Sequence, residues 1–400
     1  MSSAPLCAVI GQGYVGLPLS LELCKIGYKV FAVDIDAVRI GELKLAKTNV
    51  EGIDTNELRA QISNSRLMPT TDFNDVSGSE VIFLCVPTPL GTDRKPDLKI
   101  LESASKSIAP FLTPGVIVIT ESTIEPGTTR NILIPIFEKG SGLNRDEIHI
   151  VFSPERIDPA NEKWRIDNTP KLVAGLREES AQKAKEIYLK FITDVHVCSS
   201  LEVAETAKLL ENTFRLINIS FVNELMIFCE KIGIDINHVI EAAATKPYGF
   251  MPFYPSIGVG GHCIPVDPLY LADKARKSGA IQKMIELADD INLNMPNYFV
   301  ERAEAKIGGL KEKKVLVVGV AYKPNVSDVR ETPVKSLIKG LKQKGAQVYW
   351  HDDLVKDWNG EKTVALSSDF DLAILATPHD YLDLTKIGNV PILNTRGSIQ

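Results

Sequence analysis

The 400-residue sequence lacks any apolar run of about 18 or more residues, the length that a transmembrane helix requires. Its first residues, MSSAPLCAVIG, lack the charged start and the cleavage site of a secretory signal peptide. It also lacks an excess of positive charge, because 45 Lys and Arg stand against 51 Asp and Glu, for a net charge of −6. These absences predict a cytoplasmic protein that binds neither a membrane nor nucleic acid.

Cysteine is sparse and dispersed. The sequence has six cysteines, with no C-x-x-C pair and no two at the spacing of zinc ligands, so we expect neither a disulfide framework nor a metal site. Five of them lie in or beside apolar runs, where a thiol is typically buried and inert: Cys7, Cys24, Cys85, Cys198 and Cys229.

The sixth cysteine, Cys263, has different surroundings. It lies in SIGVGGHCIPVDP (256–268), a stretch rich in Gly and Pro with no helix or strand periodicity. Loops of this kind bring a backbone close to a ligand and carry reacting groups. A nucleophile, a metal ligand and a structural thiol all remain open for Cys263 on this basis, although the adjacent His262 and Cys263 would not easily share one tetrahedral ion.

The first 35 residues have the order strand, turn, helix, strand, with the turn sequence GQGYVG (11–16). A G-x-G-x-x-G turn in this context is the dinucleotide-binding fingerprint. Gly11 would form the tight turn, Gly13 would let a pyrophosphate approach, and Gly16 would let the helix pack on the sheet. Asp34, at the end of the second strand, would bind the adenosine ribose and repel a 2′-phosphate, which favours NAD over NADP.

Further apolar runs predict a mostly parallel sheet, and a helical region and a second α/β unit follow it. The runs of the first sheet are VIFLCV (81–86), VIVIT (116–120) and IHIVF (148–152), and those of the second unit are KKVLVVGVAYK (313–323), QVYWH (347–351), FDLAILAT (370–377) and VPILN (390–394). Between them, Leu201 to Ile232 carries apolar residues at helical spacing without a breaker, which predicts one long helix.

We therefore expect an α/β fold of two Rossmann-like parallel-sheet domains joined by a helical middle domain with one long helix. The predicted boundaries are 1–198, 199–305 and 306–400. Loops that follow parallel strands gather at one edge of the sheet, where ligands bind. Thr88, Thr123 and Glu155 lie in three such loops.

Polar residues with possible catalytic roles occur in two places. Lys208 and Asn212 have i, i+4 spacing on the long helix, so they share one face. Glu155 could act as an acid or a base after its strand. Each of these groups alone is more often simply solvated, but together with an NAD fingerprint and Cys263 they suggest a dehydrogenase that uses a covalent thiol adduct.

Several motifs, in order, resemble the UDP-glucose/GDP-mannose dehydrogenase family over essentially the whole chain. They are GQGYVGLP from Gly11, VPTP from Val86, SPE from Ser153, KLLEN from Lys208, GGHCIPVD from Gly260, AYKP from Ala321 and DVRET from Asp328. The resemblance implies an NAD-binding domain, a helical middle domain, a C-terminal UDP-binding domain and a homodimer built around the long helix.

The resemblance also implies residue roles. The catalytic group is Cys263 as nucleophile, Asp267 as its nearby carboxylate, Lys208 and Asn212 as the oxyanion and water-positioning pair, and Thr123 and Glu155 in the hydrolytic water and base network. The NAD-binding group is Gly11, Gly13, Tyr14, Val15, Gly16, Asp34, Arg39, Thr88, Thr123 and Arg330. The substrate-binding group is Glu155, Arg156, Lys208, Asn212, Gly260, Gly261, Lys323 and Arg396.

Two departures from the UDP-glucose pattern refine the expected substrate. The loop is GGHCIPVD where UDP-glucose members usually carry G-G-S-C, and Pro159 stands where a second glutamate is usual. Both changes are similar to the branch that acts on UDP-N-acetylhexosamines. We expect a UDP-N-acetylglucosamine 6-dehydrogenase, with UDP-N-acetylmannosamine as the alternative and UDP-glucose after it.

Two other classes of protein are weighed against this interpretation. A β-hydroxyacid or 6-phosphogluconate-type dehydrogenase shares an NAD domain, a long helix and a Lys-x-x-x-Asn pair, but it needs no thiol and lacks the second α/β domain. A non-catalytic nucleotide-sugar sensor would bind its ligands without turnover. Cys263 in its Gly- and Pro-rich loop favours the nucleotide sugar dehydrogenase over both.

Overall fold

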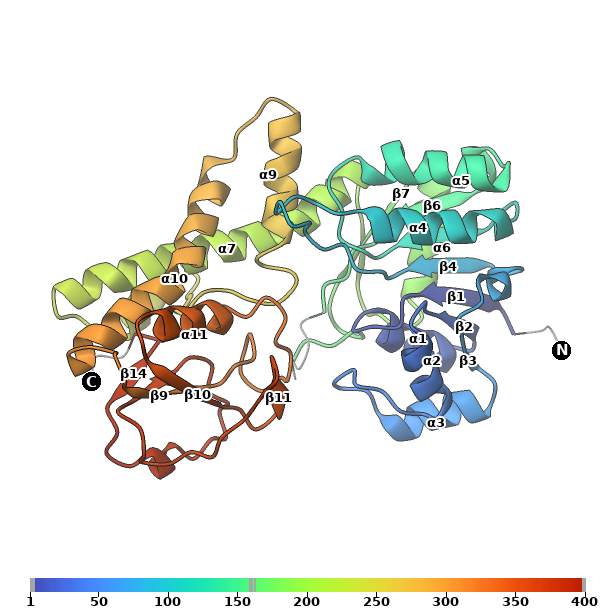
Figure 1. Ribbon diagram of the computed structural model, residues 1–400. Helices are drawn as coiled ribbons and strands as arrows, with labels where there is room; N and C mark the ends of the chain where they lie inside the picture. The colour runs from blue at the N-terminus through green and yellow to red at the C-terminus, as the bar shows by residue number, and fades with distance from the viewer. Residues whose placement is uncertain (1–3, 158–160, 162, 398–400) are drawn as a thin grey trace. The chain divides into compact units, whose positions relative to one another are not determined.

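The computed structural model describes residues 4–157, 161 and 163–397, and the chain forms two compact units, Met1–Leu210 and Glu211–Gln400 (Figure 1). Pro159 lies outside the described residues. The middle helices and the C-terminal sheet both belong to the second unit. The division into three domains at residues 198 and 305 stays a prediction.

The first unit is built on an eight-stranded sheet of order β3-β2-β1-β4-β5-β6-β7-β8. Its strands are β1 (Leu6–Ile10), β2 (Lys29–Val33), β3 (Leu67–Thr70), β4 (Val81–Leu84), β5 (Ile117–Thr120), β6 (His149–Phe152), β7 (Lys171–Gly175) and β8 (Val195–Val197). Every pair is parallel except β6 with β7. This confirms the predicted Rossmann-like sheet, whereas β3, β7 and β8 were not predicted.

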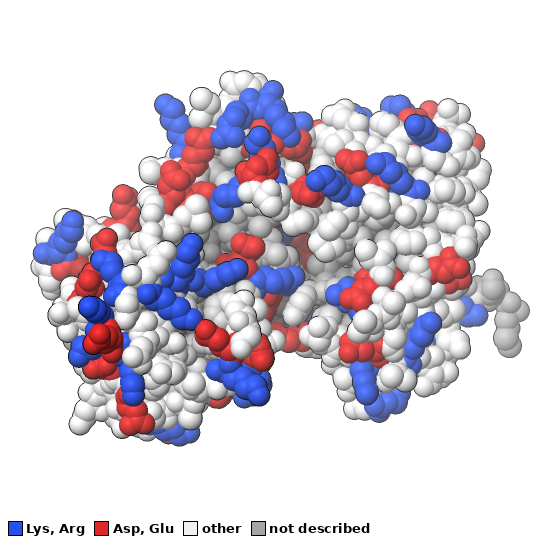
Figure 2. Space-filling model, viewed as in Figure 1, with Lys and Arg blue, Asp and Glu red and all other residues white. Residues whose placement is uncertain are grey.

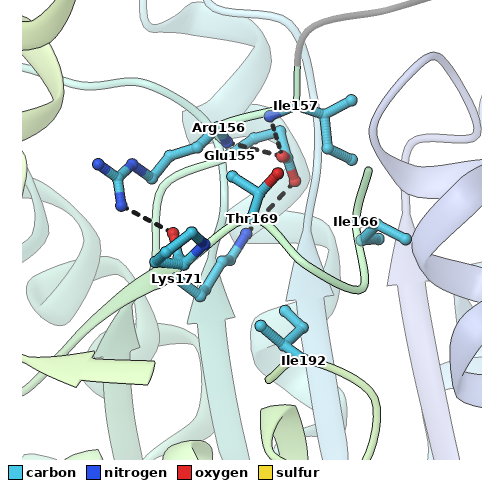
Figure 3. A pocket seen from close by; sticks show the side chains of 8 residues that line it. Glu155, Arg156, Ile157, Ile166, Thr169, Lys171 and Ile192 are labelled. Carbon is cyan, nitrogen blue, oxygen red and sulfur yellow. Dashed lines mark hydrogen bonds and ion pairs between the residues drawn. The ribbon is translucent and has the colours of Figure 1, made fainter. Parts of the chain in front are cut away.

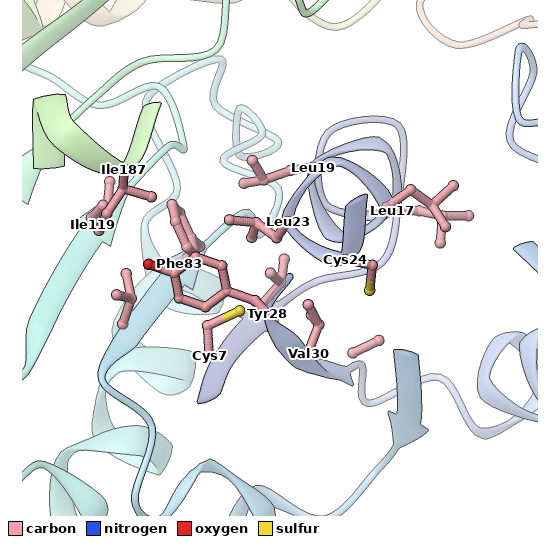
Figure 4. Close-up of a cluster of buried hydrophobic side chains, with 14 of the residues drawn as sticks. Cys7, Leu17, Leu19, Leu23, Cys24, Tyr28, Val30, Phe83, Ile119 and Ile187 are labelled. Atoms are coloured by element: carbon pink, nitrogen blue, oxygen red, sulfur yellow. The ribbon is translucent and has the colours of Figure 1, made fainter. Parts of the chain in front are cut away.

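Helices cover both faces of this sheet. Successive side chains of β1 point to opposite faces of the sheet. Cys7 and Val9 pack in a core with α1 (Gly16–Lys25) and α6 (Glu178–Tyr188) on one face. Ala8 and Ile10 pack with α4 (Lys99–Ile108) and α5 (Ile134–Ser141) on the other face. Figure 4 shows Leu19 and Leu23 of α1 beside Phe83 in the first of these cores. Two short helices, α2 (Ala37–Lys44) and α3 (Thr55–Ser63), complete the unit.

The long helix α7 (Leu201–Lys231) has 31 residues and confirms the predicted element. It begins where Ser200 Oγ accepts a hydrogen bond from Val203 N at 3.2 Å, so Ser200 satisfies one of the first N–H groups of the helix. The helix runs through the boundary between the two units at Leu210 and Glu211.

The second unit combines helices with a parallel four-stranded sheet of order β10-β9-β13-β14. Its strands are β9 (Lys314–Val318), β10 (Gln347–His351), β13 (Leu372–Leu375) and β14 (Ile392–Asn394), and a small hairpin is formed by β11 (Asp357–Trp358) and β12 (Glu361–Lys362). Its helices after α7 are α8 (Ile236–Ala244), α9 (Asp267–Lys277), α10 (Lys283–Ile307) and α11 (Val334–Gln343). This confirms the predicted second α/β unit.

The surface carries charges of both signs. On the face shown in Figure 2, Lys and Arg side chains are interspersed with Asp and Glu side chains. Within the described residues, no helix combines the length and the apolar character needed to cross a membrane.

The turn between β1 and α1 depends on close backbone contact. Gly11 has φ +93°, its N–H donates to Val33 O at 2.8 Å, and a Cβ on it would lie 2.6 Å from Cys85 O. A Cβ on Gly16 would lie 1.7 Å from Gly11 O, whereas a Cβ on Gly13 would meet no described atom within 4 Å. Gly11 and Gly16 are therefore required by the fold, and Gly13 leaves open space at the start of the helix.

This difference predicts opposite outcomes for two alanine variants. Gly16→Ala should lower the free energy of unfolding by about 1–3 kcal/mol, because the new methyl group collides with backbone that no side-chain rotation can relieve. Gly13→Ala serves as the matched control and should keep wild-type stability. Urea unfolding followed by circular dichroism measures both. Equal stability of the two variants would contradict the packing role of Gly16.

Candidate active site

Asp34 lies at the end of β2 and is nearly buried, with 7% of its surface exposed. Its Oδ2 accepts hydrogen bonds from Gln12 N at 2.8 Å and from Arg39 Nη1 at 2.9 Å, and its Oδ1 accepts from Asp36 N at 3.0 Å. The predicted acidic residue is therefore fixed beside the glycine turn, with the predicted Arg39 against it.

These features fit a dinucleotide. The open space at Gly13 suits a pyrophosphate at the N-terminus of α1, where N–H groups and the helix dipole favour an anion. Asp34 supplies a carboxylate at the distance along the chain that a ribose contact requires. Tyr14 and Val15 lie in the same turn and are half-buried.

The parallel strands bring the other predicted residues of the first unit to the same edge. Thr88 follows β4, Thr123 follows β5 and Glu155 follows β6, and all three are half-buried. The loops after β5 and β6 are joined by hydrogen bonds from Ser153 N to Thr120 O at 2.9 Å and from Glu155 N to Glu121 O at 3.3 Å. The expectation that these loops gather is confirmed.

The Glu155 carboxylate is held on both oxygens. Oε1 accepts from the backbone N–H groups of Arg156 at 2.6 Å and Ile157 at 2.5 Å, and Oε2 lies 3.3 Å from Lys171 Nζ (Figure 3). A small pocket adjoins the carboxylate and is lined by Glu155, Arg156, Ile157, Ile166, Thr169, Pro170, Lys171 and Ile192. The Arg156 guanidinium, predicted to bind substrate, donates to Pro170 O at 2.7 Å.

Behind Glu155 lies a buried charged cluster that the sequence analysis missed. Lys171 Nζ donates to Glu121 Oε2 as well as to Glu155, and Tyr188 OH donates to Glu121 Oε1. Lys171 is the first residue of the otherwise apolar strand KLVAG, and a lysine in that position is the one sequence feature that could have drawn attention to the cluster.

Burial dominates the electrostatics of this cluster. It raises the pKa of Glu121 to about 7, against the lowering effect of Lys171. Burial alone would lower the pKa of Lys171, but Glu121 and Glu155 raise it overall, so the ammonium stays charged. Burial and the neighbouring Glu121 raise the pKa of Tyr188 well above its usual range, so the phenol stays neutral.

In the second unit, three predicted catalytic residues are joined. Asn212 Nδ2 on α7 donates to Asp267 Oδ2 at 2.6 Å, and both residues are buried. Asp267 begins α9, and its N–H donates to Cys263 O at 2.8 Å, so the half-buried cysteine lies in the turn that leads into the helix. Lys208, one turn before Asn212 on α7, is also buried, with 8% exposed.

The cysteine loop packs against two other motifs of the same unit. A Cβ on Gly260 would lie 2.8 Å from Glu331 O, and a Cβ on Gly261 would lie 3.0 Å from the Tyr322 ring. The Gly261 N–H donates to Arg330 O at 3.0 Å. The structure thus brings GGHC, AYKP and DVRET together.

The remaining predicted residues of this unit lie in loops. Lys323 Nζ lies 5.9 Å from the centre of the Tyr322 ring, and the Arg330 guanidinium pairs with Asp328 at 2.5 Å. Arg396 is exposed after β14, and its carbonyl accepts from Asn237 Nδ2 of α8 at 3.0 Å.

Cys7, Cys24 and Cys229 are buried as predicted, whereas Cys85 and Cys198 are half-buried, and none of the six cysteines forms a disulfide. Burial raises the pKa of Cys7, Cys24, Cys85 and Cys229, which keeps these thiols protonated and unreactive. Among the residues that the structure describes, no group of three or more His, Cys, Asp or Glu could hold a metal ion.

Comparison with known families identifies this arrangement. Sequence models of the UDP-glucose/GDP-mannose dehydrogenase family match residues 6–192 as its NAD binding domain, 202–294 as its central domain and 316–396 as its UDP binding domain. The chain belongs to this family. It is therefore an NAD-dependent dehydrogenase, and the family resemblance seen in the sequence is confirmed.

Individual relatives carry two different substrate names. A Pseudomonas aeruginosa protein named UDP-N-acetyl-D-glucosamine 6-dehydrogenase is 39% identical over 85% of this chain and 81% of its own length. A Methanococcus maripaludis protein named UDP-N-acetyl-D-mannosamine dehydrogenase is 34% identical over 86% of this chain and 78% of its own. The structure of a UDP-N-acetylmannosamine dehydrogenase from Pyrococcus horikoshii matches with TM-score 0.90 and 29% identity, over 99% of this chain and 96% of that one.

The contact between Asp34 and Arg39 predicts the basis of cofactor choice. Asp34→Asn should narrow the preference for NAD over NADP by about tenfold or more, because the charge that repels a 2′-phosphate is lost and Arg39 becomes available to it. Asp36→Asn is the control, since the exposed Asp36 lies 3.8 Å from Arg39 but caps α2 instead. Titration calorimetry with NAD and NADP measures the ratio, and an equal change in both variants would argue against this assignment.

Proposed function

We propose that this family member is a UDP-N-acetylhexosamine 6-dehydrogenase, with UDP-N-acetylglucosamine as its substrate and UDP-N-acetylmannosamine as the second candidate. The observation that carries the proposal is the placement of Cys263 beside the Asn212–Asp267 pair, in a loop that packs on the AYKP and DVRET motifs. A thiol in such a setting supports oxidation of an alcohol through to an acid, because an aldehyde must first form a tetrahedral adduct before it can lose a hydride.

In the proposed mechanism, NAD when bound accepts one hydride from C6 in each of two oxidations. Asn212 and Asp267 hold the water that takes the C6 hydroxyl proton in the first oxidation. Cys263 Sγ then adds to the resulting aldehyde carbon. Lys208 and the Asn212 amide stabilise the oxygen anion of this thiohemiacetal, which loses the second hydride and becomes a thioester.

Hydrolysis completes the proposed reaction and requires a base. Water attacks the thioester carbon and transfers a proton to the Glu155 carboxylate, with Thr123 orienting the water. The C6–S bond breaks and its electron pair goes to Cys263 Sγ. The products are the C6 carboxylic acid, the Cys263 thiolate and a protonated Glu155, and four electrons in total have left the sugar.

The choice between the two epimers rests on resemblance. The relative that shares 39% of its residues carries the glucosamine name, and relatives at 34% and 29% carry the mannosamine name. This difference in identity supports the glucosamine form as the first substrate to test.

The stoichiometry of NADH formation tests the reaction and the substrate together. With excess NAD and limiting sugar, we expect two NADH per UDP-N-acetylglucosamine and little reaction with UDP-glucose. Cys263→Ser should fail to complete the second oxidation, because a hydroxyl adds poorly to the aldehyde and cannot form the thioester. Absorbance at the NADH band and chromatography of the sugar products measure both.

Each alternative gives a different result in this assay. Two NADH only with UDP-N-acetylmannosamine would reverse the epimer assignment. One NADH per sugar would indicate a simple alcohol dehydrogenase, and full conversion to the acid by Cys263→Ser would exclude the covalent mechanism. Binding of NAD and sugar without any NADH would favour a sensor.

We also propose a homodimer formed through α7. Large apolar side chains recur along one side of this helix at helical spacing, and all are roughly half exposed: Phe214, Phe221, Phe228 and Ile232. An exposed apolar stripe of this length is costly in water, and a second copy can cover it through a two-fold, self-complementary contact.

Charge introduced into the stripe should separate the protomers. Phe221→Glu is expected to shift the protein from dimer to monomer at micromolar concentration, because two carboxylates would be buried together at the interface. Lys339→Glu, on the exposed face of α11, introduces the same side chain elsewhere and should leave the dimer intact. Sedimentation equilibrium measures the mass. A wild-type monomer, or a dimeric Phe221→Glu variant, would show that this stripe is not the interface.

A further inference from the structure

The reversal of β7 brings a lysine to the catalytic edge of the first sheet. β7 runs antiparallel to β6, with Phe152 opposite Ala174, so the chain after β6 lies beside the beginning of β7. Lys171 is the first residue of β7, and its ammonium therefore meets the loop that carries Glu155. A parallel β7 would have placed its first residue at the opposite edge.

The Lys171 ammonium lies between the carboxylates of Glu121 and Glu155, which differ in their exposure. Glu121 is fully enclosed, and its two oxygens accept from Lys171 Nζ and from Tyr188 OH. Glu155 retains 15% side-chain exposure beside the pocket of Figure 3, and its Oε1 is already fixed by two backbone N–H groups. The Lys171 contact therefore decides how Oε2 is oriented.

We propose that Lys171 is a positioning residue that orients the Glu155 carboxylate as the hydrolytic base, and that Glu121 and Tyr188 hold Lys171 in turn. This inference rests on the proposed function, in which Glu155 accepts a proton from the water that attacks the thioester. A cation 3.3 Å from Oε2 stabilises the carboxylate relative to the acid, and the two backbone N–H groups act in the same direction.

Several charged and titratable groups among the described residues lie around Glu155. The Lys171 ammonium of β7 attracts the Glu155 carboxylate, whereas Glu121 after β5 repels it. Tyr188 of α6 and Cys85 after β4 are kept neutral by burial, and the Arg156 side chain is directed to Pro170 O. Burial raises the pKa of Glu121 to about 7, so Glu121 is a group of this cluster that takes up a proton near neutral pH.

Two substitutions in the same cluster should therefore shift the pH profile in opposite directions. Lys171→Met removes the cation beside the Glu155 carboxylate, so the acidic limb of the hydrolysis rate should move up by about one pH unit or more. Glu121→Gln keeps the shape and removes the competing carboxylate, so the limb should move toward lower pH. A merely structural disturbance would not shift the acidic limb of the two variants in opposite directions.

The slowed step in Lys171→Met, hydrolysis of the thioester, should also be directly observable. At pH 7, Lys171→Met is expected to form two NADH per active site in a rapid burst and then turn over slowly, with the thioester on Cys263 detected in the mass of the intact protein. Raising the pH should accelerate hydrolysis, because the acidic limb of this variant is expected to lie above that of the wild-type protein. If Lys171→Met does not fold, Glu121→Gln alone still tests the proposal, because its acidic limb should move toward lower pH.

The outcomes separate this inference from the proposed function. Wild-type protein that forms two NADH per UDP-N-acetylhexosamine establishes the reaction first, and its failure with all three sugars would overturn both proposals. With that reaction established, an unchanged acidic limb in Lys171→Met, a shift of both variants in the same direction, or a loss of the NADH burst itself would overturn the positioning role alone.

Discussion

The common direction of β1, β2, β4, β5 and β6 is the constraint on which the first unit depends. Parallel strands end at the same edge of their sheet, so the loops after them collect there whatever their separation in sequence. Gly11, Asp34, Thr123 and Glu155 reach one edge for this reason alone. The reversed β7 adds Lys171 to that edge from its opposite end, and a sheet without the reversal would leave Glu155 without its cation.

The two units bury their carboxylates by different means. Asp267 receives a neutral amide from Asn212, which satisfies hydrogen bonding without adding a second charge. Glu121 and Glu155 instead share one ammonium, and a lone buried ammonium would be strongly unfavourable without them. The first arrangement joins one carboxylate to a neutral donor, whereas the second places one cation between two carboxylates. Under the proposed function, the second arrangement would orient the carboxylate that acts as the hydrolytic base.

Elements that depend on short stretches of sequence were predicted from those stretches. The glycine turn, Asp34, the long helix and most strands of both sheets follow from spacing and apolar runs that each lie within one short segment, whereas β3, β7 and β8 were not predicted. The Glu121–Lys171–Tyr188 cluster was missed because its members are 50 and 17 residues apart along the chain and meet only through the antiparallel pairing of β7, which no periodicity in KLVAG reveals. The contact of Gly260 and Gly261 with Tyr322 is likewise tertiary.

The contact of Gly260 and Gly261 with Tyr322 gives the glycines around Cys263 a packing role. Glycine in a loop suggests room for a ligand, yet the positions that side chains on Gly260 and Gly261 would occupy are already filled by Glu331 O and Tyr322. The glycines allow the thiol loop to lie directly on the segment that carries Lys323. Any shift of Tyr322 must therefore move the loop of Cys263 as well. Under the proposed function, a thiol that attacks one carbon of a bound sugar would benefit from this rigidity, since misplacement by about 1 Å can cost about a hundredfold in rate.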